Sequence, residues 1–241
     1  MTILKKLSND IYYFPFSKEK DRPHLGYIKG ERAALLVDAG NSPAHYNDFK
    51  KALDKEQLKT EDYCVLTHWH WDHTFGMCAF KTPVIAHTLT NKKLIEMGKW
   101  QWNEEALDKR VQEGVEIAFC AEHMRKEYSD ISTIHIREAD ICFNDHYSLD
   151  LGNKIVEIIH VEASHGEDCV IVYVPVEKVV FLGDVYTEDY YHDLKIYKDK
   201  NLSLLQKLQD LDFEIGIHGH VAPQTKQEIL AILIEMQTKA E

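Results

Sequence analysis

The stretch from His68 to His73 (HWHWDH) places three histidines and one aspartate within six residues. Imidazole nitrogens and carboxylate oxygens together are the ligands that Zn²⁺ and neighbouring divalent metals take in proteins. His68 and His70 lie two residues apart, so both imidazoles point the same way in an extended segment. Asp72 and His73 follow on the next turn. Because one open catalytic metal needs only three protein ligands, these four side chains predict two metal ions that share the loop.

Three further side chains stand where the chemistry of an α/β fold is exposed, at the ends of expected strands. His165 (in EASHGEDC) lies in a turn between two strands. Asp184 (in VVFLGDVY) follows an apolar strand and a glycine, and a carboxylate buried there requires a strong partner. His220 (in GIHGHVAP) also follows a strand and a glycine. These residues are the candidates that complete the site.

The elements that must position these residues alternate along the chain. Residues 31–40 read as a strand, 42–58 as a helix with a Ser-Pro start, and 62–67 as a strand that runs into the cluster, an order typical of an α/β fold. Residues 91–130 have a mainly helical pattern that Gly98 and Gly114 interrupt. Strands are predicted over 132–143, 147–161, 169–184 and 213–220, and helices over 201–211 and 223–240. We see no linker, so we predict one domain over 1–241 with a helical insertion at about 91–130.

The composition of the chain disfavours nucleic acids and anionic membranes as binding partners. The 28 Lys and Arg residues against 40 Asp and Glu residues give a net charge of −12, which argues against broad binding to nucleic acid or to anionic membranes. The N-terminal segment has no uninterrupted apolar region and no apolar run reaches the length of a membrane span, so we expect neither a signal peptide nor a membrane-spanning helix. The five cysteines are widely spaced and predict reduced thiols. We therefore expect a cytoplasmic protein.

Five blocks of sequence, in order, resemble the metallo-β-lactamase-fold (MBL-fold) hydrolase superfamily over essentially the whole chain. LLVDAG resembles its early Asp-Gly strand, VLTHWHWDH its HxHxDH signature, and GIHGH its final Gly-His. The segment 157–184 resembles its His-turn block and its Gly-Asp block, joined by a β-hairpin. The resemblance implies an α/β fold of the αββα four-layer sandwich type, with two mixed β-sheets face to face, helices outside and the site at one sheet edge.

The same resemblance implies how the ligands divide. His68, His70 and His165 would hold the first metal. Asp72, His73 and His220 would hold the second, and Asp184 would bridge both. Within GIHGH we favour His220 over His218, because the glycine directly before His220 matches the motif. Two divalent metal ions are expected, with Zn²⁺ favoured and Mn²⁺ or Fe²⁺ as alternatives, and Asp72 is also the catalytic candidate.

This ligand set predicts a metal-dependent hydrolase. Two divalent ions, two carboxylates and one bridging hydroxide leave one net positive charge to meet an oxyanion, and the hydroxide would be the nucleophile at neutral pH. The expected partner is a small-molecule ester, lactone, thioester or phosphodiester, and a homodimer is the assembly to test. The alternative enzyme of the same fold is a mononuclear non-haem iron oxidoreductase, similar to persulfide dioxygenases. A third class would bind metal without turnover.

Two groups of residues around the cluster leave alternatives open. Asp38 either orients a ligand histidine or the cluster loop through hydrogen bonds, or caps a turn through Gly40. For Trp69 and Trp71 we favour an apolar backing that keeps the site dry over stacking on a substrate.

The remaining aromatic residues near the expected site also have alternative roles. Trp100 and Trp102 have three alternative roles: they cover the site, form a dimer contact, or pack within the chain. For the tyrosines after Asp184 we favour aromatic packing over a phenol that donates to an oxyanion. These tyrosines are Tyr186, Tyr190 and Tyr191.

Overall fold

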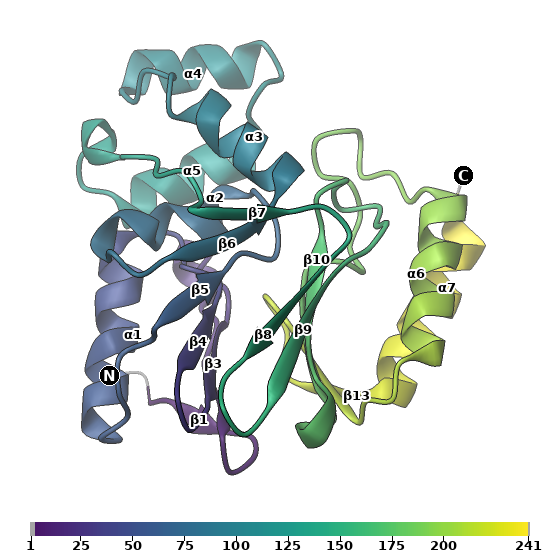
Figure 1. The fold of residues 1–241 in the computed structure, drawn as a ribbon. Coiled ribbons are helices and arrows are strands. Elements are labelled where there is room, and N and C mark those ends of the chain that lie inside the picture. The colour runs from purple at the N-terminus through teal and green to yellow at the C-terminus, as the bar shows by residue number, and fades with distance from the viewer. Residues whose placement is uncertain (1–2, 241) are drawn as a thin grey trace.

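Two β-sheets lie face to face with helices on both outer sides (Figure 1) in the computed structural model, which describes residues 3–240. The first sheet contains seven strands in the order β1-β2-β3-β4-β5-β6-β7. Its strands are β1 (Lys5–Lys6), β2 (Ile11–Phe14), β3 (Leu25–Lys29), β4 (Ala34–Val37), β5 (Tyr63–Val65), β6 (Val84–His87) and β7 (Ile141–Phe143).

The second sheet contains six strands in the order β13-β12-β11-β10-β9-β8. Its strands are β8 (His146–Asp150), β9 (Ile155–His160), β10 (Val170–Val174), β11 (Val179–Gly183), β12 (Ile215–His218) and β13 (Gln224–Thr225). Both sheets are mixed. In the first, β1 to β4 pair antiparallel and β4 to β7 pair parallel; in the second, β11 and β12 form the parallel pair.

Three apolar layers explain why the sheets stack in this way. Successive side chains on a strand point to opposite faces. In β4, Leu35 therefore packs between the two sheets, whereas Leu36 packs toward the helices on the outer side of the first sheet. In β11, Phe181 lies between the sheets and Leu182 lies under the helices that cover the second sheet. A strand buried on both faces needs a covering layer on each side, and the result is the four-layer αββα sandwich that the sequence predicted.

The described residues contain seven α-helices, and all but α2 form the outer layers. On the first sheet and above it in Figure 1 lie α1, α3, α4 and α5, and on the second sheet lie α6 and α7. Their bounds are α1 (Pro43–Lys55), α2 (Trp71–Thr74), α3 (Thr88–Met97), α4 (Glu104–Gln112), α5 (Ala118–Glu127), α6 (Lys198–Asp210) and α7 (Lys226–Lys239). Short 3-10 turns are η1 (Lys18–Lys20), η2 (Phe75–Ala79), η3 (Ile131–Thr133) and η4 (Pro175–Glu177).

The predicted helix start at Ser42-Pro43 is where α1 begins. The Ser42 hydroxyl accepts a hydrogen bond from the backbone N–H of His45 at 3.0 Å, and Pro43 stands at the first helical position. Between β6 and β7 the chain forms α3, α4 and α5, with Gly98 and Gly114 directly beyond the first two of these helices. The description of 91–130 as an insertion in one domain stays a prediction.

The strand predicted over 132–143 is wrong for most of its length, because only Ile141–Phe143 is a strand. The Asp130 carboxylate accepts from the backbone N–H and the hydroxyl of Ser132 at 2.9 and 2.6 Å, and so forms a 3-10 turn. Such local side-chain bonds compete with a sheet ladder. The Arg137 guanidinium also donates to the backbone carbonyls of Phe80 and Thr82, which fixes this segment as an irregular strap.

The helices of the described chain all fall short of the length and apolarity that a bilayer crossing requires. The five cysteines are free thiols, of which Cys64, Cys120 and Cys169 are buried.

Candidate metal centre

The predicted ligands converge at one edge of the sandwich, where the segments that follow β5, β9, β11 and β12 meet. Asp38, directly after β4, holds the loop that follows β5, because its Oδ1 accepts a hydrogen bond from the backbone N–H of Thr67 at 2.7 Å. The backbone N–H of Ala39 donates to the carbonyl of His73 at 2.8 Å. The cluster loop is therefore pinned at both of its ends by the loop of the neighbouring strand.

A three-histidine group consists of His68, His70 and His165, whose ring nitrogens lie within 4.8 Å of one another. Nε2 of His68 and Nε2 of His165 are 3.1 Å apart, and all three side chains are buried. The structure thus brings together two residues of the cluster loop and one residue from the turn between β9 and β10. These are the residues that the resemblance assigns to the first metal, and that assignment stays a prediction.

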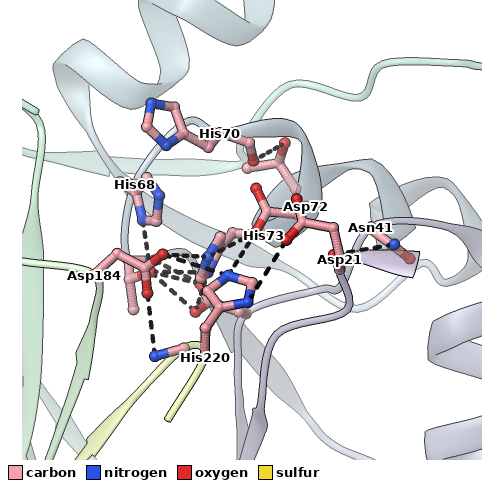
Figure 2. Close-up of polar contacts among 12 residues, drawn as sticks. Asp21, Asn41, His68, His70, Asp72, His73, Asp184 and His220 are labelled. Carbon is pink, nitrogen blue, oxygen red and sulfur yellow. Dashed lines mark hydrogen bonds and ion pairs between the residues drawn. The ribbon is translucent and has the colours of Figure 1, made fainter. Parts of the chain in front are cut away.

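An aspartate–histidine group lies beside it and consists of Asp72, His73, Asp184 and His220 (Figure 2). Asp72 Oδ2 lies 3.0 Å from His220 Nε2 and 3.1 Å from His73 Nε2. Asp184 Oδ2 lies 3.4 Å from His220 Nε2 and 3.5 Å from His73 Nε2. Figure 2 shows these four side chains turned toward one another from three segments of the chain. The ring centroids of His68 and His73 are 4.1 Å apart, so the two groups are in contact.

Hydrogen bonds behind the groups set which ring nitrogen faces the centre. Asp38 Oδ2 lies 2.8 Å from His73 Nδ1, which leaves His73 Nε2 directed between the carboxylates. Nδ1 of His165 lies 2.7 Å from the Thr187 hydroxyl and 3.3 Å from the Glu188 carbonyl. Of the two roles considered for Asp38, the structure shows the hydrogen bonds to a ligand candidate and to the cluster loop. Such partners fix the tautomer of a metal-ligating histidine.

The glycines of the Gly-Asp and Gly-His blocks are required by the close approach of the strands. At Gly219 a Cβ atom would lie 2.3 Å from Asp184 Oδ1 and 2.9 Å from His73 Cε1. At Gly183, which has a φ of +51°, a Cβ would lie 2.5 Å from the Thr67 hydroxyl. A larger residue would push against the aspartate–histidine group at Gly219 and against Thr67 of the cluster loop at Gly183.

The histidines of the three-histidine group have lowered pKa values, which favour the neutral imidazole. Burial lowers the pKa of His68 and of His70 well below the ordinary value, and the neighbouring imidazoles add to the effect. Burial also lowers the pKa of His165. Neutral imidazole is the form that binds a metal, so this group needs no loss of protons at neutral pH.

The aspartate–histidine group has the opposite electrostatics. Burial alone would raise the pKa of Asp72, but the adjacent His73 and His220 outweigh it and hold that pKa well below the usual range. Burial would likewise lower the pKa of His220, but Asp184 and Asp72 raise it to about 9. The pKa of His73 is raised well above its ordinary value because Asp72, Asp38 and Asp184 outweigh burial. These residues form a mutually neutralising set of ion pairs.

Two further residues lie near this group, and only one of them was considered from the sequence. Asp21 follows η1 with a left-handed backbone (φ 51°), and its Oδ1 lies 3.7 Å from His220 Nδ1. Burial and nearby Asp72 raise the pKa of Asp21 to about 7. His218 Nδ1 lies 3.4 Å from Asp184 Oδ1, yet His218 is not in either group. His218 was visible in GIHGH, whereas no motif marked Asp21, because the backbone turn brings it to the site.

The two tryptophans of the cluster loop differ. Trp71 is 1% exposed and lies in the apolar layer under the first sheet, as expected for a backing residue. Trp69 is partly buried, and its ring lies 5.1 Å from that of Tyr191 and 5.1 Å from the Lys93 ammonium. Trp100 and Trp102 pack against the same apolar layer and on the Arg110 guanidinium.

The tyrosines after Asp184 mostly pack, the role favoured from the sequence. The hydroxyl of Tyr186 donates to Gln224 and that of Tyr191 donates to Glu116. Tyr190 is 43% exposed, and its ring lies 5.9 Å from that of His165. Only Tyr190 among the three therefore lacks a hydroxyl partner in the described residues.

Both groups face a cavity of about 420 Å³, within the size range of small-molecule sites. Its floor includes His70, Asp72, His165, Asp184 and His220. The other lining residues are Lys18, Asp21, Ile117, Phe119, Cys120, Thr187, Tyr190, Tyr191, His218 and Val221.

Comparison with known proteins agrees with this architecture. The family model described as the metallo-beta-lactamase superfamily matches residues 23–220. The chain therefore belongs to the metallo-β-lactamase superfamily. No curated protein sequence matches the chain.

Solved structures show the same fold at low sequence identity. A metallo-β-lactamase from Pontibacter korlensis aligns with a TM-score of 0.70 at 18% identity, over 99% of each chain. A metallo-β-lactamase family protein from Thermus thermophilus aligns with a TM-score of 0.68 at 18% identity, over 97% of this chain and 80% of that one. The sec-alkylsulfatase Pisa1 from a Pseudomonas species aligns with a TM-score of 0.71 at 13% identity, over 98% of this chain and 41% of that one.

Proposed function

We propose that this protein is a binuclear metal-dependent hydrolase of a small-molecule ester, lactone, thioester or phosphodiester. One observation carries the proposal: two groups of metal-ligand side chains touch each other at the floor of a single cavity. The proposed ligands are His68, His70 and His165 for one ion, Asp72, His73 and His220 for the other, and Asp184 for both.

The residues fit divalent cations by their chemistry. Three buried imidazoles gather without a carboxylate among them, and Nε2 of His68 and Nε2 of His165 face each other at 3.1 Å. Nε2 of His73 is buried and points between two carboxylates without making a hydrogen bond among the described residues. Nitrogen and oxygen donors in this arrangement suit Zn²⁺, with Mn²⁺ and Fe²⁺ as alternatives.

When bound, two such ions supply a hydroxide at neutral pH and polarise the scissile oxygen of the substrate. The chain orients the site through Asp38 on His73 and through Thr187 on His165. The pKa of the Asp72 carboxylate is held low beside His73 and His220, so Asp72 stays ionised and can accept a hydrogen bond from water in the cavity. In ester hydrolysis the acyl carbon gains the water oxygen, the bond to the leaving oxygen breaks, and that oxygen takes up a proton.

The fold does not identify the substrate, so the site has to be tested with several classes of substrate. The structural relatives include β-lactamases and a sec-alkylsulfatase, so one architecture accommodates different chemistries. A decisive test is a screen of protein reconstituted with Zn²⁺ or with Mn²⁺ against lactones, thioesters, β-lactams, esters and phosphodiesters. Hydrolysis that depends on added metal supports the proposal. Oxygen consumption with a thiol-derived substrate and one bound iron would replace it with the oxidoreductase alternative.

Other expectations remain predictions to be tested alongside. They are a cytoplasmic location, a homodimer, a small-molecule substrate and the absence of nucleic-acid and membrane partners.

A further inference from the structure

The cavity that the metal groups line has a polar floor and an apolar rim. Its floor is made of histidines and aspartates, whereas its rim carries apolar side chains from three separate segments. Ile117 and Phe119 come from the start of α5, Tyr190 from the loop after β11, and Val221 from the residue after His220. A polar floor with an apolar wall is the usual plan of a site that fixes one reactive group and buries the rest of a ligand.

Three of these rim side chains are unusually exposed for their size. Phe119 is 51% exposed, Tyr190 is 43% exposed and Val221 is 39% exposed. The Phe119 ring lies 4.1 Å from the ring of His123, so one side of it is supported while the rest is open. Single exposed apolar residues need no explanation, but a set that lines one cavity marks a binding surface.

The rim is fixed in position relative to the metal groups. The Tyr191 hydroxyl donates to Glu116 Oε1 at 2.9 Å, which ties the loop after β11 to the start of α5. The Tyr191 ring also lies 5.4 Å from that of His70. Glu116 is only 4% exposed, so the link is sheltered from water. An apolar wall held in this way needs little ordering when a ligand binds.

The charges in the cavity argue against a strongly anionic ligand. Two bound cations would neutralise the carboxylates of the metal groups, and away from those groups Lys18 is the single lysine among the described lining residues. Recognition of a polyanion requires a cluster of cations. The cavity therefore favours a ligand that is neutral away from its reactive group.

We propose that the substrate carries an uncharged apolar group, an alkyl chain or an aromatic ring, that lies against Phe119, Tyr190 and Val221. This inference rests on the proposed function, because the hydrolysable bond then lies over the two metal groups. The preferred substrates are hydrophobic acyl esters, thioesters or lactones, and short polar acyl groups are poor ones.

The test uses metal-loaded protein and a series of straight-chain hydroxamates, from acetohydroxamate to octanohydroxamate. Hydroxamates chelate metal without turnover, so calorimetry measures their Kd independently of hydrolysis. We expect the Kd to fall about twofold to fourfold for each added methylene, as burial of apolar surface requires. The Phe119→Ser variant should flatten this dependence. The control is Val176→Ser, which changes a side chain that is 69% exposed in η4 and does not line the cavity.

The outcomes separate this inference from the proposed function. Chain-length dependence that Phe119→Ser removes, without turnover of any ester, retains the apolar wall and rejects the hydrolase. Ester turnover with equal Kd values across the series retains the hydrolase and rejects the wall. Chain-length dependence that survives in Phe119→Ser places the apolar group elsewhere and also overturns the inference. A wild-type dimer that Phe119→Ser dissociates, together with a flat series, assigns the rim to a second copy of the chain instead.

Discussion

The two metal groups lie in contact, yet their buried polar side chains differ in charge. The three-histidine group (His68, His70 and His165) has no carboxylate, and burial keeps its imidazoles neutral. The aspartate–histidine group (Asp72, His73, Asp184 and His220) balances anions against protonated imidazoles. Buried charges are tolerated when they are paired, and buried neutral imidazoles when a donor or a cation meets them.

The comparison shows that one loop contributes side chains to two groups that differ in protonation state and in ion pairing. Before metal binds, the aspartate–histidine group is held together by its own ion pairs, at distances of 3.0–3.5 Å. The three-histidine group has no such pairing and is already in its ligand form. We therefore expect metal to enter the three-histidine group with little proton release, and the second group to exchange protons for a cation.

The largest expected effect comes from removal of one ligand from each group. His70→Ala and His220→Ala should each lower hydrolysis by about 10²- to 10³-fold, the scale of losing one electrostatic group in an active site. Each variant should also bind one metal fewer, as measured by elemental analysis. His87→Ala is the control, because His87 is also buried but stacks on His160 outside both groups. Full activity with two bound metals in His70→Ala would reject its assignment as a ligand.

The same pair of variants separates the groups by metal-free stability. His220→Ala leaves Asp72 and Asp184 with one partner fewer, so the free energy of unfolding should fall by about 1–3 kcal/mol. His70→Ala removes no ion pair of the aspartate–histidine group and should cost less in the absence of metal. Urea unfolding in excess chelator measures both. An equal loss in the two variants would contradict the electrostatic difference.

A smaller effect is expected when the hydrogen bond between Asp38 and His73 Nδ1 is weakened. Asp38→Asn keeps the shape but weakens the acceptor at His73 Nδ1, so affinity for the second ion should fall about 10- to 100-fold while the first is retained. The matched control is Asp62→Asn, since Asp62 also accepts a backbone bond, from Ala34 at 2.7 Å, away from the site. Competition with a chromophoric chelator gives both affinities. Equal weakening of the two ions would show that Asp38 holds the loop as a whole.

Proton release should distinguish the two binding steps. The pKa of His220 is about 9, so its imidazole is protonated at pH 7 and must lose that proton when a cation binds. Each released proton makes affinity fall about tenfold for each unit decrease in pH below that pKa. Calorimetry in buffers of different ionisation enthalpy should find more protons released with the second ion than with the first. Equal release in both steps would remove the proposed difference.

The last comparison is with Asp168, a buried carboxylate outside both metal groups. Burial raises the pKa of Asp168 to about 6, although Thr90 donates to it at 2.7 Å. Its folded pKa lies above the unfolded value, so stability is greatest below about pH 4 for this group and is lost as pH rises toward and beyond 6. The loss is at most about 3 kcal/mol. Asp168→Asn should remove this slope in chemical unfolding curves measured from pH 4 to pH 7, and an unchanged slope would assign it to other groups.

The sequence could predict the parts of the site that rest on residue type at strand ends. His68, His70 and the Gly-Asp and Gly-His pairs are local signals, and the structure brings their side chains together. A strand was also predicted at 132–143, but the bonds of the Asp130 carboxylate to Ser132 hold the start of that segment in a 3-10 turn.

Other parts of the site depend on contacts between distant segments, which no local pattern records. Asp21 reaches His220 because its own left-handed backbone turns the chain directly after η1, and the Tyr191–Glu116 hydrogen bond joins residues 75 positions apart. The apolar rim likewise gathers side chains from α5, the loop after β11 and the residue after His220. Tertiary packing, rather than motif, sets these features.

The number of divalent ions bound per chain tests the central claim most directly. Protein saturated with Zn²⁺ and dialysed free of excess metal should contain two ions per chain by elemental analysis, one of which is lost in His70→Ala and one in His220→Ala. A single ion per chain in the wild type, unchanged by His220→Ala, would contradict the account of two groups that work together.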